Sequence, residues 1–213
     1  VKEERGSIDK FVADELGYKD ENELHRHLAA EQIDALGLAL NNIKDGKGFI
    51  IGDQTGIGKG RVCASVIRWA KKNGKIPVFV SMQPDLYADM MRDLNDIGST
   101  DVVPFITNSD MRGKNALLLP DGSKLTALPE KKYKQALADM QQGKMPEGCN
   151  AIFTTYSQLQ GQSGKTNPRQ LALNALQSKI VLVLDEAHNA GGSSSSIGEY
   201  MRSLTQGMPN GVL

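Results

Sequence analysis

The first stretch of the chain has the hydrophobic spacing of helices. Apolar residues recur at intervals of three and four through residues 7–44, so that they fall on one face of each turn. Ser7 is placed to cap the first turn, and Gly46 is placed to end the last one. The pattern therefore predicts a helical segment over residues 7–44.

From Gly48 onward the pattern changes to short apolar runs that alternate with helical spacing. The runs typical of buried strands are 49–51, 77–80, 102–106, 150–155 and 180–184. Helical spacing returns over 60–72, 85–97, 133–140, the segment after Pro168, and 197–204. Strands that alternate with helices predict an α/β sandwich with a mostly parallel central sheet and right-handed crossovers.

Two segments stand apart from this alternation. Residues 1–30 are expected to form a helical appendage, which leaves 31–213 as the main lobe. Residues 107–127 carry few signals of regular structure, so we expect a surface excursion there, inside an insertion around 107–147.

Composition adds limits rather than a function. The chain has 213 residues, 39% hydrophobic and 23% charged, as expected of an ordinary globular domain with a substantial core. No apolar run approaches the ~20 residues that span a bilayer, and no signal peptide opens the chain, so we expect no membrane partner. The formal net charge is +0, so any contact with nucleic acid must be local or made by another part of the protein.

The two cysteines and the first residue bear on the setting of the protein. Cys63 and Cys149 are too few for a disulfide framework, which favours a reducing cytoplasm. The chain begins with Val1 rather than Met, which indicates a fragment or a processed product. We expect the isolated chain to be a monomer.

The segment between residues 52 and 61 has the composition of a phosphate-binding loop. Glycines let the backbone wrap an anion, and the helix that follows offers its amide groups and positive dipole end. Lys59 would reach the β- and γ-phosphates. The residues expected to contact nucleotide are Asp53, Gln54, Thr55, Gly56, Ile57, Gly58, Lys59, Gly60 and Arg61.

This loop departs from the usual pattern at two positions. Asp53 stands where the first glycine is expected, and Gly60 stands where a Ser or Thr usually follows the lysine to hold Mg²⁺. Water, Thr55 or nothing could replace the missing hydroxyl. A glycine-rich turn that binds no ligand is the alternative interpretation.

An acidic pair follows the last apolar run. Residues 180–184 deliver Asp185 and Glu186 to the carboxyl end of a predicted strand, the edge at which ligands bind in open α/β sheets. Asp185 would orient Mg²⁺ through its water shell. Glu186 would act as general base toward the attacking water and would also face the metal through water. The alternative is a solvated turn.

Taken together, these residues resemble superfamily 2 helicases and, more narrowly, the strawberry notch-like proteins, including the phage and bacterial helicase–methyltransferase type. The resemblance is carried by Glu31–Leu36, Gly48–Arg61, Phe153–Ser157 and Leu184–Gly192. The strawberry notch group itself has Gly-Lys-Gly-Arg at the phosphate loop, so the resemblance makes Gly60 a family trait.

The resemblance implies the first lobe of a RecA-like P-loop NTPase that uses ATP and Mg²⁺, with Glu186 and Lys59 as catalytic residues. Gln32 would read the adenine edge, His188 would couple hydrolysis to movement, and Tyr18 is a candidate for stacking on the base. Segments 81–84 and 154–157 would contact a nucleic-acid backbone.

The function implied is the motor lobe of a helicase or translocase that acts on DNA rather than RNA. A second RecA-like lobe, absent from this chain, would supply arginines worth about 10³–10⁵ in rate, so we predict slow turnover by these residues alone. One alternative is an ATP-switched regulatory module that interacts with proteins and separates no strands. Another is a P-loop kinase, which the segment Asp185–His188 disfavours.

Overall fold

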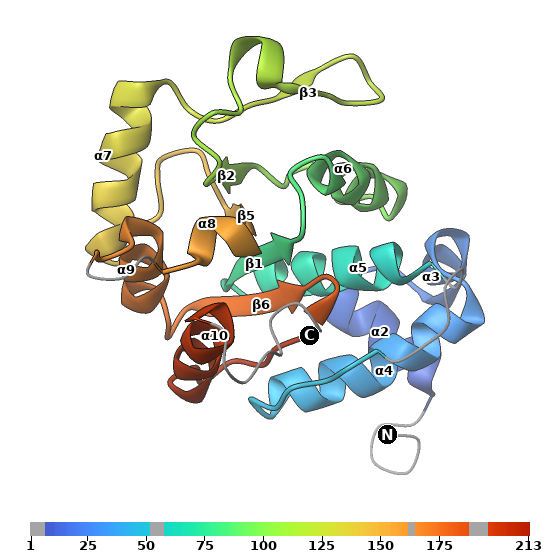
Figure 1. The fold of residues 1–213 in the computed structure, drawn as a ribbon. Coiled ribbons are helices and arrows are strands. Elements are labelled where there is room, and N and C mark those ends of the chain that lie inside the picture. The colour runs from blue at the N-terminus through green and yellow to red at the C-terminus, as the bar shows by residue number, and fades with distance from the viewer. Residues whose placement is uncertain (1–6, 52–57, 162–164, 188–195) are drawn as a thin grey trace.

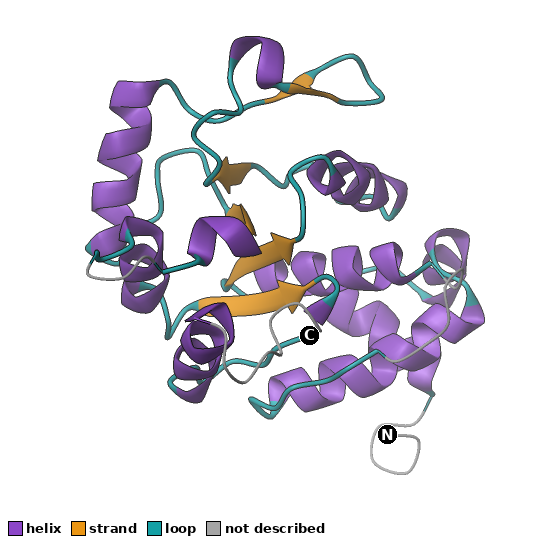
Figure 2. Cartoon of the chain, in the orientation of Figure 1, coloured by secondary structure: helices purple, strands orange, loops and turns teal. Residues whose placement is uncertain are grey.

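The computed structural model describes residues 7–51, 58–161, 165–187 and 196–213. Helices cover both sides of a central sheet (Figure 1, Figure 2). Of the helices in these ranges, none is both long enough and apolar enough to cross a bilayer.

The chain enters the fold through three helices before the first strand. They are α2 (Ile8–Leu16), α3 (Glu21–His27) and α4 (Ala30–Lys44). The predicted helical segment is confirmed, but it is broken twice. Gly17, with φ 73°, ends α2 and Asp20 caps the start of α3, while the extended backbone of Leu28 and Ala29 separates α3 from α4. Ser7 caps α2 as expected, with its hydroxyl accepting a hydrogen bond from the N–H of Lys10.

Four parallel strands form the central sheet in the order β2–β5–β1–β6. Their bounds are β1 (Ile76–Ser81), β2 (Pro104–Ile106), β5 (Ala151–Thr155) and β6 (Ile180–Leu184). Strands β2, β5 and β6 lie within predicted apolar runs, and β1 extends the predicted run 77–80 by one residue at each end. The α/β class with a mostly parallel sheet is therefore confirmed.

Alternate residues of the strands face two separate cores. Phe79 of β1 and Val183 of β6 face the core shared with α2, α4, α5 (Lys59–Lys72) and α6 (Leu86–Asp96). Val80 and Leu182 face the core on the other side. The helices of that second core are α7 (Glu130–Gln141), α9 (Pro168–Ala175) and α10 (Ser196–Gln206), and the short α8 (Tyr156–Leu159) precedes α9.

The prediction of a buried strand over residues 49–51 is wrong. Gly48 makes only an isolated parallel bridge to Val212, and the side chain of Ile50 is 86% exposed. Val212 also bridges Leu182 of β6, so the last residues of the chain lie between β6 and Gly48. The apolar run fails to form a strand because only its first residues meet a partner, through the bond from the Phe49 N–H to the Val212 carbonyl.

The segment between β2 and α7 leaves the sheet. It holds η1 (Gly113–Asn115) and an antiparallel hairpin of β3 (Leu117–Leu118) and β4 (Lys124–Leu125). Helix α7 itself lies against the sheet, where Tyr133 stacks on Phe105 with ring centroids 5.3 Å apart.

Candidate nucleotide site

The amino end of α5 presents backbone N–H groups and an ammonium group together. Gly58 precedes the helix with φ 74°, a left-handed conformation that residues with a Cβ rarely adopt. Within the described part of the chain, no side chain caps this end. The first amides of a helix and its positive dipole end favour an anion. Lys59, the first helical residue, adds its positive charge at the same place.

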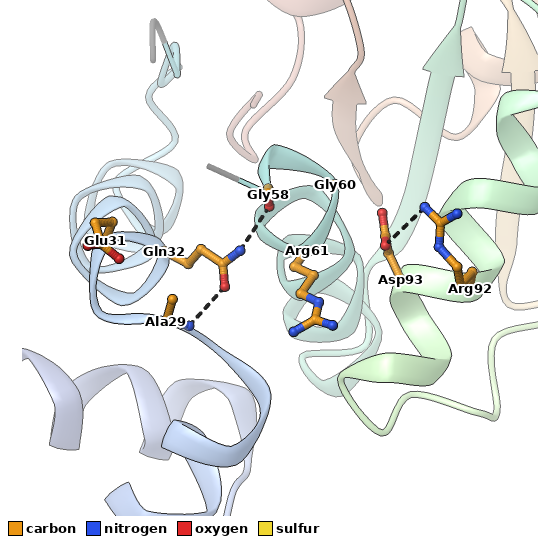
Figure 3. Close-up of a pocket in the computed structure, with 8 residues that line it drawn as sticks. All are labelled: Ala29, Glu31, Gln32, Gly58, Gly60, Arg61, Arg92 and Asp93. Carbon is orange, nitrogen blue, oxygen red and sulfur yellow. Dashed lines mark hydrogen bonds and ion pairs between the residues drawn. The ribbon is translucent and has the colours of Figure 1, made fainter. Parts of the chain in front are cut away.

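Gln32 joins the start of α4 to this helix end. Its Oε1 accepts a hydrogen bond from the N–H of Ala29 at 2.9 Å, and its Nε2 donates to the carbonyl of Gly58 at 3.2 Å (Figure 3). The residue is only 5% exposed. Two backbone groups therefore fix the Gln32 side-chain amide beside the end of the phosphate loop. The contact of Gln32 with adenine remains a prediction.

A cavity of about 710 Å³ opens between Gln32 and α6, within the size range of small-molecule sites. We call it the glutamine-side cavity. It is lined by Ala29, Glu31, Gln32, Gly58, Gly60, Arg61, Arg92 and Asp93. Gln32 and Asp93 lie on opposite sides of the first turn of α5 (Figure 3).

Arg61 lines this cavity but is held by protein acceptors. Its Nη1 donates to the carbonyl of His27 at 3.1 Å, and its Nη2 lies 3.1 Å from the Asp96 carboxylate. These contacts fasten the first turn of α5 to α3 and α6. The expected contact of Arg61 with nucleotide remains a prediction, and the guanidinium already serves the packing of three helices.

A second cavity of about 360 Å³ brings the lysine and the acidic pair together. We call it the carboxylate-side cavity. It is lined by Phe49, Ile50, Ile51, Lys59, Cys63, Leu184, Asp185, Glu186, Ala187 and Leu213. Lys59 and the Asp185–Glu186 pair come from distant parts of the sequence, and the fold places them around one space.

The sheet and α8 position the acidic pair. The N–H of Asp185 donates to the carbonyl of Val80 at 2.9 Å, which continues the β1–β6 pairing by one residue. The hydroxyl of Tyr156 donates to the Asp185 carbonyl at 2.8 Å. Glu186 then turns with φ 52°, the only positive φ of a non-glycine residue in the described ranges. Such strain concentrates at functional sites because the surrounding structure must sustain it.

Burial and like charge shape the electrostatics of this cavity. Burial, and secondly the neighbouring Glu186, raise the pKa of Asp185 above its ordinary value, while Lys59 opposes the shift. Burial raises the pKa of the Cys63 thiol to about 12, and Asp185 and Asp93 add to that rise. The Cys63 thiol therefore lies close enough to carboxylates of β6 and of α6 for both to disfavour its thiolate form.

Some predicted residues lie outside the described ranges. They are Asp53, Gln54, Thr55, Gly56, Ile57 and His188.

Tyr18 is not available for stacking on a base. It is 6% exposed, its hydroxyl donates to the Ile97 carbonyl at 2.7 Å, and its ring is covered by His27 and Arg68. The tyrosine serves the core because α2 ends at Gly17 and directs the next side chain inward.

The segments expected to contact nucleic acid use several hydroxyls internally. Ser81 donates to the Gln83 carbonyl at 2.9 Å, and Thr154 accepts from Thr107 at 2.7 Å, with both residues buried. Met82 (43% exposed) and the exposed Ser157 remain accessible at the same strand ends.

Sequence reasoning missed Asp93. Nothing around it in the sequence marks a functional residue, because its place depends on how α6 packs against α5. The one available signal was Gly60, since a glycine in place of Ser or Thr leaves room for a neighbour. Burial raises the pKa of Asp93, opposed chiefly by Arg92.

The donor set of the carboxylate-side cavity fits Mg²⁺ bound largely by phosphate and water. Among the described residues, no three His, Cys, Asp or Glu side chains converge as a preformed metal site. Mg²⁺ is commonly held by one or two carboxylates together with substrate phosphates. Asp185 and Glu186 are oxygen donors of that kind beside Lys59.

Comparison with known proteins agrees with this arrangement. The model of the family described as P-loop containing NTP hydrolase pore-1 matches residues 17–208. Protein strawberry notch of Drosophila melanogaster is 28% identical over 206 residues, which cover 86% of this chain and 11% of that protein. Protein FORGETTER 1 of Arabidopsis thaliana is 30% identical over 186 residues, covering 83% of this chain and 12% of that protein.

The human relative gives the same picture. Protein strawberry notch homolog 1 of Homo sapiens is 28% identical over 176 residues, which cover 76% of this chain and 11% of that protein. The chain thus spans 11 to 12% of the length of these relatives. The family match and the helix-flanked parallel sheet together give the fold as a RecA-like P-loop NTPase lobe.

Proposed function

This chain belongs to the P-loop containing NTP hydrolase pore-1 family as a strawberry notch-like first lobe, and we propose that it is the ATP-binding motor lobe of a nucleic-acid-dependent ATPase. In this proposal, ATP hydrolysis drives movement on DNA, or remodelling of DNA, in a helicase or translocase.

One observation carries the proposal: Lys59, Asp185 and Glu186 line the same cavity. A triphosphate at the amino end of α5 would meet the Lys59 ammonium and the helix amides. Glu186, whose φ of 52° turns the backbone directly after β6, would accept a proton from the attacking water as general base. Asp185 would hold Mg²⁺ through water, and Mg²⁺ supplies charge neutralisation on the phosphates.

We place the rest of the nucleotide in the glutamine-side cavity. Gln32 is fixed beside Gly58, and its cavity continues from the same helix end. A base placed there would have the Gln32 amide at its edge while its phosphates reach Lys59.

The nucleic-acid part of the proposal rests on the strand-end segments 81–84 and 154–157, of which Met82, Gln83 and Ser157 are exposed. A second lobe would complete the site with arginines worth about 10³–10⁵ in rate. We also propose a reducing cytoplasm as the setting, because Cys63 and Cys149 are free thiols.

The test is ATP turnover by the longer protein that includes a second lobe, measured without nucleic acid and with single-stranded DNA, double-stranded DNA or RNA. We expect stimulation by DNA that exceeds stimulation by RNA, and little turnover from this chain alone. Hydrolysis that no polynucleotide stimulates would contradict the motor and favour an ATP-switched regulatory module.

A further inference from the structure

A side chain at position 60 would meet the Asp93 carboxylate in its present place. A Cβ built on Gly60 would lie 2.0 Å from Oδ2 of Asp93 and 3.1 Å from its Cγ. A contact of 2.0 Å does not occur between real atoms, so the Asp93 carboxylate can keep this place only while position 60 has no Cβ. The carboxylate oxygen thus lies beside the point from which the side chain of a serine or threonine at position 60 would extend.

Helix α6 holds Asp93 at this place through its buried face. Met90 and Leu94 flank the aspartate and are buried in the core shared with α5. Asp96, one turn further, pairs with Arg61 of α5 at 3.1 Å. The two helices are therefore joined on both sides of Asp93, which fixes the distance from its carboxylate to the first turn of α5.

The Asp93 side chain is poorly compensated within the protein. It is 16% exposed, and its nearest cation is the Arg92 guanidinium, 3.6 Å from Oδ1 (Figure 3). Arg92 is itself 51% exposed, and it also pairs with Asp89 at 2.9 Å. In the described part of the chain, Oδ2 has no hydrogen-bonding or ionic partner, so the oxygen nearest Gly60 is available to a ligand.

Resting on the proposed function, we propose that Asp93 supplies the oxygen that the loop hydroxyl usually gives to Mg²⁺, directly or through a metal-bound water. Carboxylate oxygens are the ligands that Mg²⁺ prefers, and one or two of them suffice when phosphates and water complete its shell. Asp93 lines the cavity beside Gly60 and Asp185 lines the cavity beside Lys59, so in this proposal the metal lies at the first turn of α5, between the two cavities.

The test compares ATP affinity measured with Mg²⁺ and with a chelator, in wild type and in Asp93→Asn. We expect Mg²⁺ to tighten ATP binding in wild type. In the variant the ratio of ATP affinity with Mg²⁺ to affinity with chelator should be about 10–100-fold smaller, the usual effect of removing a group that positions a metal. Asp89→Asn is the matched control, because it removes an exposed carboxylate one turn earlier on α6 and should keep the wild-type gain.

A reciprocal exchange gives a second readout. Gly60→Ser alone should bind Mg²⁺-ATP poorly, because its Cβ meets the Asp93 carboxylate. Gly60→Ser combined with Asp93→Ala makes room for the hydroxyl, and we expect this double variant to regain most of the Mg²⁺-dependent gain. A double variant no better than Asp93→Ala would overturn the proposal.

Other outcomes separate this inference from the proposed function. Wild type that binds no ATP contradicts the proposed function itself. An equal Mg²⁺ gain in wild type and Asp93→Asn overturns only the inference. Tighter ATP binding by Asp93→Asn in both conditions would make the carboxylate a competitor of phosphate instead of a metal ligand.

A measurement on wild type avoids reliance on any variant. With Mn²⁺-ATP in place of Mg²⁺-ATP, paramagnetic broadening of backbone amide signals should be strong at Asp93 as well as at Asp185. Broadening at Asp185 with none on α6 would overturn the role of Asp93.

Discussion

The amino end of α5 receives carboxylates from two regions that are built differently. The end of β6 offers Asp185 and Glu186, which are adjacent in sequence and held by the sheet through the bond from the Asp185 N–H to Val80. Helix α6 offers Asp93, which is held by packing of its buried neighbours against α5. The first region is a sequence motif. The position of Asp93, in contrast, depends on how α6 packs against α5 in the folded chain.

The difference shows which parts of a nucleotide site a sequence motif can record. The end of a buried strand fixes the position of the residues that directly follow it. An apolar run followed by two acidic residues is therefore enough to locate the acidic pair in the sequence. A helix face depends on rotation and on the neighbouring helix, so a single aspartate leaves no local pattern. Among the described residues of the phosphate-loop segment, the glycine at position 60 is the sequence feature that reflects this contact.

The largest expected effect is at Glu186. In the longer protein with its second lobe, Glu186→Gln should lower the rate of ATP hydrolysis by about 10²–10⁴-fold, the usual contribution of a general base. Nucleotide affinity should change little, because the amide keeps the shape of the side chain. Single-turnover hydrolysis and nucleotide titration measure the two quantities. A variant that hydrolyses ATP at the wild-type rate would remove Glu186 from the chemistry and weaken the contrast with Asp93.

The packing that holds α6 can be tested through Leu94, which is fully buried beside Asp93. Leu94→Ala should lower the free energy of unfolding by about 2–5 kcal/mol. Loosened packing should also reduce the Mg²⁺-dependent part of ATP affinity more than the Mg²⁺-independent part. Denaturant unfolding and ATP titration provide the measurements. Equal losses in both parts would mean that α6 supports the whole site and not the metal position in particular.

The smallest expected effect is on the melting temperature, which the buried charge of Asp185 should lower. Its pKa is raised in the folded state by burial and by Glu186, so the folded chain favours the protonated form. At neutral pH the nucleotide-free protein therefore bears a cost that Asp185→Asn removes, and the variant should melt a few degrees higher. Below the ordinary aspartate value of 3.8 both states are protonated and the gain should vanish.

The control for this prediction is Asp89→Asn, which removes an exposed carboxylate paired with Arg92 and should not raise the melting temperature. Thermal unfolding at a series of pH values gives both curves. An Asp185→Asn gain that persists at the acidic end would assign the effect to something other than the carboxylate charge.

Sequence patterns gave most of the elements but not the edge of the sheet. Helix α5 and strand β6 follow directly from apolar spacing, because both are long enough and buried enough to leave a clear period. The run 49–51 has the same apolar composition as a buried strand, yet Ile50 is 86% exposed, since composition does not say whether a partner strand is present. Gly17 breaks the first helical segment through a left-handed φ that apolar spacing alone does not reveal.

The candidate site divides in the same way. Lys59, Asp185 and Glu186 were located from order and spacing, and the structure gathers them around one cavity. The hydrogen bonds that fix Gln32 between Ala29 and Gly58 could not be read from sequence, because they depend on how α4 meets α5.

The most direct test of the central claim is calorimetric titration of Mg²⁺-ATP into wild type, Lys59→Ala and Lys132→Ala. Lys132 lies exposed on α7, away from both cavities, so its loss should leave the affinity unchanged. We predict that Lys59→Ala weakens binding by at least about tenfold, which corresponds to ~1.4 kcal/mol. Equal affinity in all three proteins would contradict a nucleotide site at the amino end of α5.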